Sequence, residues 1–329
     1  QHRPTTPGRA VEMEEMRITA RRGEGGYEFE AYVARELFER ATALLNTQKC
    51  REAVDLYDQL DREFPSSRYA SSALYNAGLC LQAQADFPAS AERYIGVRER
   101  HRASDDVRDA SFQLCEVLVQ LQRWPELLAV SEELLAGEGL SPDERLEAMA
   151  RRGQGLLGAG RLDEAEQQAR GALSFFRTRT GDEAIRDEFF AAASNYVLAE
   201  TFLVRAQGMA FPEGTEAQKE VLLARAQLLL EAQREYFNTI QFRNLDNLHW
   251  AAASGYRIGN MYDELWHAIM TAPVPAHLPP EGHSVYREEL AKFVKPLIRH
   301  AIRYWELTLM MIERTGIKTE LHNGARLER

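Results

Sequence analysis

Hydrophobic and polar positions between residues 36 and 65 follow the spacing of two short amphipathic helices joined by a turn. A polar break at 46–49 separates the helices, and Pro65 ends the second one because a residue before proline is driven out of the helical region. The apolar positions are Leu37, Ala41, Leu44, Leu45, Ala53, Leu56, Tyr57 and Leu60. Two helices this short cannot bury their apolar faces alone, so the pattern predicts further copies stacked on them.

The same register recurs along the chain. The first, second and fourth units have a small residue in the first helix and a second one twelve residues later in the partner helix, whereas the third unit is looser and has Leu127 at the second position. In the first two units an aromatic residue follows four positions further on. The four sets are Ala41, Ala53 and Tyr57; Gly78, Ser90 and Tyr94; Cys115, Leu127 and Ser131; and Gly153, Ala165 and Ala169. Small residues let two helix backbones approach closely, and the aromatic ring fills the space beside the crossing. The register therefore predicts four helical hairpins.

Two further units keep the pattern but lengthen its middle. The fifth has Ala199 in a helix predicted over 184–208, and its second helix follows a break at 211–214. The sixth is interrupted by a proline-rich stretch, 273–280, that cannot be helical and must form a loop. The remaining register positions are Ala232 and Tyr236 in the fifth unit, and Gly259, Tyr262, Ala301 and Trp305 in the sixth.

The segments ALYNAGLCL (73–81) and GRLDEAEQQA (160–169) resemble the two helix signatures of the tetratricopeptide repeat (TPR) family. The resemblance implies an all-α, TPR-like α-solenoid, a right-handed superhelix of about six helical hairpins with the last two lengthened. We accordingly expect four regions. These are a flexible N-terminal arm (1–26), four hairpins (27–178), two extended hairpins that cap the solenoid (179–316) and a C-terminal tail (317–329).

A narrower resemblance concerns bacterial cell-envelope TPR proteins. EFPSSRYASSALYNAGLC (63–80) resembles repeats of the Tol–Pal-associated periplasmic coordinator and of the outer-membrane assembly lipoprotein. The stretches 255–275 and 286–309 are similar to repeat proteins associated with gliding-motility complexes. The resemblance implies a scaffold in the periplasm or at the outer membrane. A chain that begins at Gln1 fits an exported protein whose leader has been removed. A cytoplasmic location stays open.

Residues 14–21 (EEMRITAR) resemble the short extended box near the start of TonB-dependent outer-membrane proteins. Such a segment could add a strand to the sheet edge of a partner, which would give the chain a strand or peptide contact. The alternative is a plain solvated tail.

The composition of the chain excludes some classes of partner. The net charge of −10 argues against nucleic acid, because phosphate binding needs a basic stripe. The sequence contains no run of 18 apolar residues, so we expect no segment that spans a membrane. Three cysteines are too few for a disulfide framework, and each falls at an expected buried helical position, where free thiols are usually inert. A bridge between Cys80 and Cys115 is the alternative, and it would need an oxidising compartment.

No catalytic motif stands out, so we expect a non-enzyme without cofactor or metal. His-Glu-x-x-His, Cys-x-x-Cys and Gly-x-Ser-x-Gly are all missing. The string Gly153-x-Gly155-x-x-Gly158 matches a dinucleotide fingerprint, but it lies inside a predicted helix and follows no strand. The one metal site considered as an alternative combines His267, His283 and Glu281.

The first helices of TPR hairpins line a concave groove, and here they carry a ladder of rings. Five of the six residues placed three before the small positions are aromatic: Phe38, Tyr75, Phe112, Ala150, Tyr196 and Tyr256. An apolar ladder suits a peptide or a partner helix. The predicted partner-binding residues are Phe38, Thr42, Leu45, Tyr75, Asn76, Leu79, Phe112, Glu116, Tyr196 and Tyr256. The rings could instead pack against neighbouring hairpins, or the protein's own termini could fill the groove.

We therefore expect a protein-interaction scaffold within a cell-envelope assembly. A clamp for a partner's C-terminal carboxylate is disfavoured, because Asp109 and Glu116 stand where basic residues would be needed. An alternative from another class is a small-ligand or enzyme-accessory subunit with a pocket in the long hairpins, around Trp250, Tyr256, Trp266 and Trp305. A third alternative is a subunit that assembles with its own copies.

Overall fold

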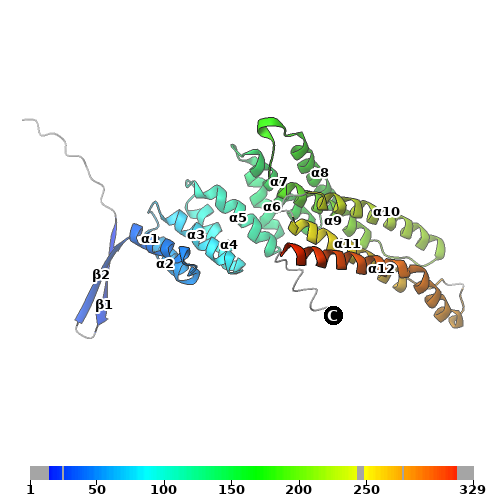
Figure 1. Cartoon of the computed structure of the whole chain (residues 1–329). Coiled ribbons are helices and arrows are strands. Elements are labelled where there is room, and N and C mark those ends of the chain that lie inside the picture. Colours follow the sequence, from blue (N-terminus) through cyan, green and yellow to red (C-terminus); the bar gives the residue numbers. More distant parts are fainter. Residues whose placement is uncertain (1–14, 24–25, 243–247, 276–277, 317–329) are drawn as a thin grey trace, which may run out of the picture. The chain divides into compact units, whose positions relative to one another are not determined.

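The computed structural model describes residues 15–23, 26–242, 248–275 and 278–316. Within these ranges the chain forms twelve α-helices and two β-strands (Figure 1). The chain divides into two compact units, unit 1 (Gln1–Arg123) and unit 2 (Trp124–Arg329). This division lies within the third predicted hairpin, whereas the division predicted after residue 178 falls inside unit 2. Each unit is described by itself.

Unit 1 is a β-hairpin followed by five helices of similar length. Each helix packs on the next in sequence, and α3 also contacts α5. The pairing of α1 with α2 and of α3 with α4 agrees with the first two predicted hairpins, and α3 and α5, the first helices of the second and third, are neighbours. The elements are β1 (Met16–Gly23), β2 (Gly26–Val33), α1 (Ala34–Asn46), α2 (Cys50–Glu63), α3 (Ala70–Ala83), α4 (Phe87–Arg100) and α5 (Asp106–Gln120).

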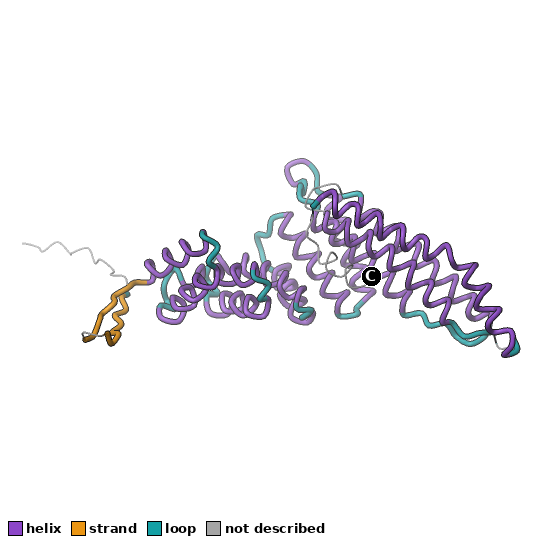
Figure 2. The backbone as a smooth tube through the Cα atoms, turned by 60° about the horizontal axis from the view of Figure 1, so that its bottom comes forward, coloured by secondary structure: helices purple, strands orange, loops and turns teal. Residues whose placement is uncertain are grey.

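The two strands correct the prediction of a flexible arm. β1 and β2 pair antiparallel, from Met16 opposite Val33 to Gly23 opposite Gly26 (Figure 2). The prediction was wrong for 16–23 because it looked for a helical period in a segment whose β-branched Ile18 and Thr19 favour strands. The extended segment predicted at 14–21 lies in β1 from Met16 onward, and residues 1–14 lie outside the described residues.

The β-hairpin is attached to the C-terminal end of α2. Arg17 donates a hydrogen bond of 3.0 Å from its guanidinium to the carbonyl oxygen of Glu63, and it lies 5.6 Å from the ring centre of Phe64. Tyr32 donates its hydroxyl proton to the Glu63 carboxylate, and its ring meets Phe64 edge-on at 6.1 Å. A charge-assisted hydrogen bond and buried ring contacts thus hold the hairpin to the first helix pair.

The turn inside each hairpin repeats the same backbone geometry. One residue in each turn has a positive φ: Gln48 at 60°, Ala85 at 58°, Gln122 at 55° and Gly160 at 72°. Three positions after the end of the first helix, a backbone N–H returns to a carbonyl of that helix, as from Lys49 to Leu44 at 2.9 Å. This is the left-handed C-terminal cap that satisfies the last helical carbonyls. The repeat is therefore present in the turns as well as in the helices.

Unit 2 contains seven α-helices, of which the last four are the longest. Consecutive helices pack on one another, and α9 also contacts α7 and α11. The two lengthened hairpins agree with the prediction, although the helix predicted over 184–208 begins at Phe189. The elements are α6 (Trp124–Ala136), α7 (Pro142–Gly158), α8 (Leu162–Thr178), the 3₁₀ turn η1 (Gly181–Glu183), α9 (Phe189–Gln207), α10 (Thr215–Ile240), α11 (Leu248–Thr271), the 3₁₀ turn η3 (Pro280–Gly282) and α12 (His283–Thr315).

The breaks between the long helices lie where the sequence placed them. α10 follows Gly214, whose φ of 96° is open to glycine and strained for other residues. Between α11 and α12, the described residues of the proline-rich stretch from 273 to 279 lie outside α-helices. Residues 317–329, predicted as a tail, lie outside the described residues.

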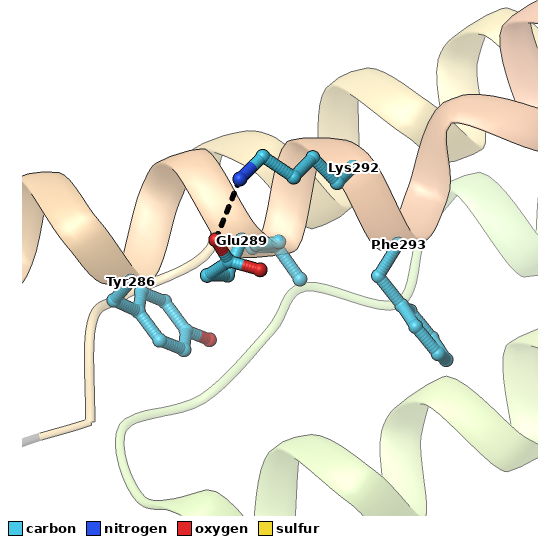
Figure 3. A pocket seen from close by; sticks show the side chains of 5 residues that line it. Tyr286, Glu289, Lys292 and Phe293 are labelled. Atoms are coloured by element: carbon cyan, nitrogen blue, oxygen red, sulfur yellow. Dashed lines mark hydrogen bonds and ion pairs between the residues drawn. The ribbon is translucent and has the colours of Figure 1, made fainter.

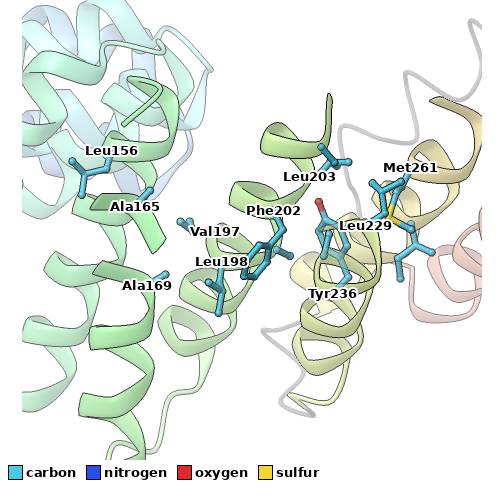
Figure 4. Close-up of a cluster of buried hydrophobic side chains, with 14 of the residues drawn as sticks. Leu156, Ala165, Ala169, Val197, Leu198, Phe202, Leu203, Leu229, Tyr236 and Met261 are labelled. Carbon is cyan, nitrogen blue, oxygen red and sulfur yellow. The ribbon is translucent and has the colours of Figure 1, made fainter. Parts of the chain in front are cut away.

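The largest core of unit 2 surrounds α9. Figure 4 shows Val197, Leu198 and Phe202 of α9 between the small residues of α8 and the larger side chains of α10. Ala165 and Ala169 of α8 leave the room that these α9 side chains fill. Burial of each large apolar side chain contributes about 1.5–3 kcal/mol relative to exposure, and the buried side chains of α9 belong to a helix that contacts α7, α8, α10 and α11.

Close helix crossings occur at the predicted small residues. A methyl group added at Gly78 would lie 2.5 Å from Cε1 of Tyr94, and the Ser90 hydroxyl donates to the Gly78 carbonyl oxygen at 2.9 Å. In unit 2 the indole of Trp305 covers Gly259 in the same way. Both pairs match the predicted register, in which an aromatic residue of the second helix fills the space beside a small residue of the first.

Candidate functional site

The candidate site in unit 1 is the face that α1, α3 and α5 share, called here the inner-helix face. Its centre is a polar link through the Tyr57 hydroxyl. Thr42 lies 3.1 Å from that hydroxyl, and Asn76 donates to it at 3.4 Å. Thr42 and Asn76 are half-buried and come from different hairpins. The structure therefore brings these two predicted residues together.

Phe38 and Tyr75 contribute rings to the inner-helix face, but each ring also packs within the protein. Phe38 stacks on Tyr69 with 5.3 Å between ring centres and lies 5.8 Å from Tyr57. Tyr75 lies 5.9 Å from the ring of Tyr94. Both Phe38 and Tyr75 are half-buried, so part of each ring remains exposed for a ligand. Packing against one side of each ring fixes the orientation of its exposed side.

The remaining predicted residues of unit 1 differ in exposure. Leu45, Leu79 and Glu116 are half-buried, whereas Phe112 is only 8% exposed and offers little surface to a partner. Phe112 is therefore mainly a packing residue of α5.

Acidic side chains from α5 give the inner-helix face its charge. Asp109 is exposed, and Asp106 accepts a hydrogen bond of 2.9 Å from Ser72 of α3. Burial raises the pKa of Tyr75 above its ordinary value, and the negative charges of Asp109 and Asp106 raise it further. Tyr75 therefore stays a neutral hydrogen-bonding hydroxyl at physiological pH, beside two carboxylates.

Tyr196 and Tyr256 belong to unit 2, so eight of the ten predicted residues share unit 1 and these two do not. Tyr196 packs between Tyr236 at 5.6 Å and Trp250 at 5.3 Å. Burial raises its pKa well above the ordinary value, and Glu200 raises it further. Tyr256 is half-buried. Tyr196 thus lies among other aromatic rings of its own unit, which is the packing alternative that the sequence left open.

A buried ion pair in unit 2 was missed by the sequence analysis. Arg257 of α11 makes two hydrogen bonds of 2.7 Å to the two carboxylate oxygens of Glu200 of α9, and Tyr236 of α10 donates to the same carboxylate at 2.5 Å. Glu200 is 8% exposed. Burial alone would lower the pKa of Arg257, but hydrogen bonding to Glu200 and its charge outweigh burial and raise it. Three helices therefore meet at one carboxylate.

No short motif marked this ion pair, because its partners are 57 residues apart. The register offered one clue. Glu200 follows the small residue Ala199, at the position where the hairpins of unit 1 place Thr42 and Leu79. A charged residue at a position expected to face a neighbouring helix calls for a partner of opposite charge on that helix.

Two of the three tryptophans proposed for a ligand pocket, Trp250 and Trp305, make packing contacts within the protein. Trp305 donates from Nε1 to the Asn260 side-chain oxygen at 2.9 Å and covers Gly259. Trp250 is 9% exposed and lies in a cluster with Phe189 and Tyr196. These contacts account for both indoles as parts of helix packing.

A shallow surface cavity of about 520 Å³ lies along the start of α12 (Figure 3). Its lining residues are Tyr286, Glu289, Leu290, Lys292 and Phe293. Figure 3 shows Lys292 paired with Glu289, at 2.7 Å, and Phe293 directed away from its helix. Phe293 is 83% exposed. All lining residues come from one helix, so the cavity lacks the polar groups from several elements that a specific small-ligand site uses.

The alternative metal and disulfide sites are not formed. Within the described part of the chain, no three His, Cys, Asp or Glu side chains gather in a way that could hold a metal ion. His267 pairs with Asp263, and His283 lies 3.2 Å from the Leu278 carbonyl oxygen. Cys80 and Cys115 are not joined by a disulfide, so the alternative of a bridge between them is wrong.

The glycine string of α7 also has a packing explanation. Gly155 and Gly158 lie inside or at the end of α7, where Leu128 and Trp124 of α6 would collide with added methyl groups. A dinucleotide fingerprint would need a strand before this helix. Among the described residues, no helix is long and apolar enough to cross a membrane.

Comparison with known proteins gives structural similarity at low identity. No family model and no curated protein matches the chain. The solved structure titled MamA RS-1 ArsTM double mutant is 14% identical, over 64% of this chain and 97% of that chain, with a TM-score of 0.42. A tetratricopeptide repeat protein from Parabacteroides merdae is 12% identical, over 82% of this chain and 98% of that chain, with a TM-score of 0.40. The TPR-like, all-α architecture is evident from the helical hairpins of the chain itself.

Proposed function

We propose that the protein is a non-catalytic interaction scaffold and that a segment of a protein partner docks on the inner-helix face of unit 1. The observation that carries the proposal is the fixed, half-buried set formed by Phe38, Thr42, Tyr75 and Asn76, drawn from two hairpins. Rings that pack on one side and stay open on the other lose little side-chain entropy when a partner binds. Rigid aromatic anchors are the residues that contribute most at protein interfaces.

The charge of the inner-helix face selects the class of partner. Asp109 is exposed and Glu116 is half-buried, while the neutral Thr42 and Asn76 offer hydrogen bonds to a peptide backbone. A neutral or basic segment is therefore favoured over one that ends in a carboxylate, which two acids would repel.

We further propose a cell-envelope setting for this scaffold. Support comes from the resemblance of 63–80, 255–275 and 286–309 to envelope and gliding-motility repeat proteins. The β1 strand provides a second contact, because its outer edge is not paired with another strand among the described residues and an extended segment of a partner could add to it. Fractionation of cells that express the full chain tests the setting, and recovery in the cytoplasm alone would contradict it.

Site-specific photo-crosslinking in the native cell tests the docking face. A photoreactive amino acid at Thr42, Tyr75 or Asp109 should capture the same partner segment. The matched control positions are Arg62 of α2 and Glu99 of α4, which are exposed residues of second helices. Capture of one partner from both sets, or capture of only this chain's own residues from the first set, would contradict docking on the inner-helix face.

Charge reversal tests the same face with purified components. The substitutions Asp109→Lys and Glu116→Lys should each weaken binding of the captured segment by roughly fivefold, since an exposed ion pair contributes up to about 1 kcal/mol. The effect should shrink as salt is added, because exposed charges are screened. Equal affinity of both variants and the unchanged protein at low salt would rule out a charge contribution from α5.

A further inference from the structure

Exposed basic side chains gather in the middle of α12, although the protein has a net charge of −10. The sequence has no acid between Glu289 and Glu306, and the four basic residues in this stretch are spaced three, four and four positions apart. Such spacing places them on one face of the helix, in a stripe about 16 Å long. The four residues are Lys292, Lys295, Arg299 and Arg303.

Three of these cations have no counter-charge within the protein. Lys292 pairs with Glu289 at 2.7 Å. Lys295, Arg299 and Arg303 make no ion pair or hydrogen bond with another described residue. Like charges three and four residues apart on a helix repel one another, so an anionic partner on this face would relieve the repulsion.

Exposed apolar side chains lie along one side of the basic stripe. Phe293 is 83% exposed and points away from its helix (Figure 3). It precedes Tyr304 by about three helical turns, so both rings lie on the same side of α12. Tyr304 lies 6.1 Å from Phe237 of α10, between ring centres. Phe237 in turn shares a face of α10 with the exposed Leu223 and Leu230, which are spaced seven residues apart.

We propose that an acidic amphipathic helix of a protein partner binds this part of α12, called here the basic–apolar surface. Acids spaced three or four residues apart on the partner helix would meet the unpaired cations, and an adjoining apolar row would cover Phe293. This site belongs to unit 2 and is independent of docking on the inner-helix face of unit 1. The surface consists of Lys292, Phe293, Lys295, Arg299 and Arg303.

The charge pattern favours a protein segment over an anionic membrane. Acids stand at both ends of the basic stripe: Glu288 and Glu289 precede it, and Glu306 and Glu313 follow it, all of them exposed. A membrane extends beyond the stripe and would place these acids, on a protein that is already negative, against lipid phosphates. A short acidic helix needs to contact only the stripe itself.

Fluorescence anisotropy with the full chain and a labelled synthetic peptide tests the proposal. The peptide is a helix of about five turns with Glu on one face and Leu on the adjoining face, and its matched control has Lys in place of every Glu. At low salt the Glu peptide should bind roughly tenfold more tightly than the Lys peptide. Added salt should reduce this difference, because exposed charges are screened.

Substitutions locate the binding. Arg299→Glu and Arg303→Glu should each weaken binding of the Glu peptide by roughly fivefold. Phe293→Ala should weaken it by a similar factor and leave its salt dependence unchanged, since this variant removes an aromatic anchor and no charge. Arg177→Glu is the matched control, because Arg177 is an exposed cation of α8, and it should bind as the unchanged protein does.

Arg299→Glu should also gain affinity for the Lys peptide, a result that a variant unable to fold would not give. Equal binding of both peptides by the unchanged protein, or full binding of the Glu peptide by Arg299→Glu, would overturn the proposal. Tighter binding to phosphatidylglycerol vesicles than to the Glu peptide would overturn it in favour of a membrane. A dimer in light scattering that Arg299→Glu dissociates would overturn it in favour of a second copy of the chain.

Discussion

Gly78 and Gly171 show how differently two helical glycines can be placed. Gly78 of α3 is buried beneath the ring of Tyr94. Gly171 of α8 is exposed, and the nearest atom to an added methyl group would be the Met149 methyl carbon at 3.8 Å. Only Gly78 is required by a close approach. At Gly171 the glycine simply leaves the helix backbone with more freedom than alanine would.

The substitution Gly78→Ala should destabilise the protein by about 1–3 kcal/mol, because the methyl group would overlap Tyr94 and force α3 and α4 apart. Gly171→Ala, the matched control, should stabilise it by up to about 1 kcal/mol through helix propensity. Urea unfolding followed by circular dichroism measures both. A Gly78→Ala variant as stable as the unchanged protein would show that the crossing at Tyr94 is loosely packed.

The sequence predicted residue positions well where spacing alone decides them. Gly78 with Tyr94 and Gly259 with Trp305 face each other as the register required. The predicted partner-binding residues are a mixed set, since Phe112 is buried while Thr42 and Asn76 meet at one hydroxyl. Spacing shows which face of a helix a residue occupies, but not how deeply a neighbouring helix covers it.

Among the elements, α9, α10 and α11 are joined by a polar contact within an apolar interface. Glu200, Tyr236 and Arg257 each come from a different helix of this group. A buried carboxylate without its cation is costly, because burial penalises the charged form and no water replaces the lost partner.

The substitution Arg257→Met should therefore destabilise unit 2 by about 3–5 kcal/mol, since it leaves Glu200 buried without its cation. The double variant Glu200→Gln with Arg257→Met should recover part of that loss, because the charge is then absent. Chemical denaturation compares the two. The control Arg161→Ala removes an exposed ion pair with Glu164 and should leave the unfolding midpoint unchanged. Similar midpoints for the single and double variants would show that Glu200 is adequately solvated.

Element boundaries were predictable to different degrees. The long helices of unit 2 and their breaks followed from apolar period, Gly214 and the proline-rich stretch. The β-hairpin was missed because strand pairing depends on contacts between β1 and β2 and on the docking of Tyr32 at Glu63, neither of which a helical period reveals. The positive φ angles of Gln48 and Ala85 could not be predicted from the sequence either, because tertiary contacts are what stabilise this conformation in residues other than glycine.

At the scale of the whole molecule, the all-α architecture was predictable because every hairpin repeats the same local rules. The division into two units was not. It falls between α5 and α6, although Arg123 and Trp124 occupy the turn of an apparently ordinary repeat. Repeat spacing predicts the fold of each hairpin. The strength of packing between neighbouring hairpins depends on the side chains that both hairpins contribute to their interface.

Both units contain buried tyrosines, and this makes an alkaline limit to stability predictable. Burial raises the pKa of Tyr57 in unit 1, and of Tyr196 and Tyr236 in unit 2, above the ordinary value of 10.0. Below that value both folded and unfolded states keep the proton, so the stabilisation is fully present. Above it the unfolded state ionises first, and stability falls as pH rises toward the folded-state pKa values.

Unfolding free energies measured from pH about 8 to about 11 should therefore decrease above pH about 10, and tyrosinate absorbance should grow together with unfolding. The variant Tyr236→Phe removes one contributor and should show a shallower decrease. Stability that does not change up to pH about 11, or tyrosinate absorbance that grows without unfolding, would contradict this account.

The buried pair of Glu200 and Arg257 has a consequence for how the chain finds its fold. Similar hairpins can stack on the wrong neighbour during folding, and such mispairing is a characteristic failure of repeat proteins. At the position of Glu200, α7 carries the uncharged Gln154. If α11 paired with α7 instead of α9, Arg257 would be buried opposite an amide. The ion pair thus contributes to the specificity of helix pairing. An arrangement in which α11 packs on α7 would bury Arg257 without a carboxylate partner, so the native order of hairpins is favoured.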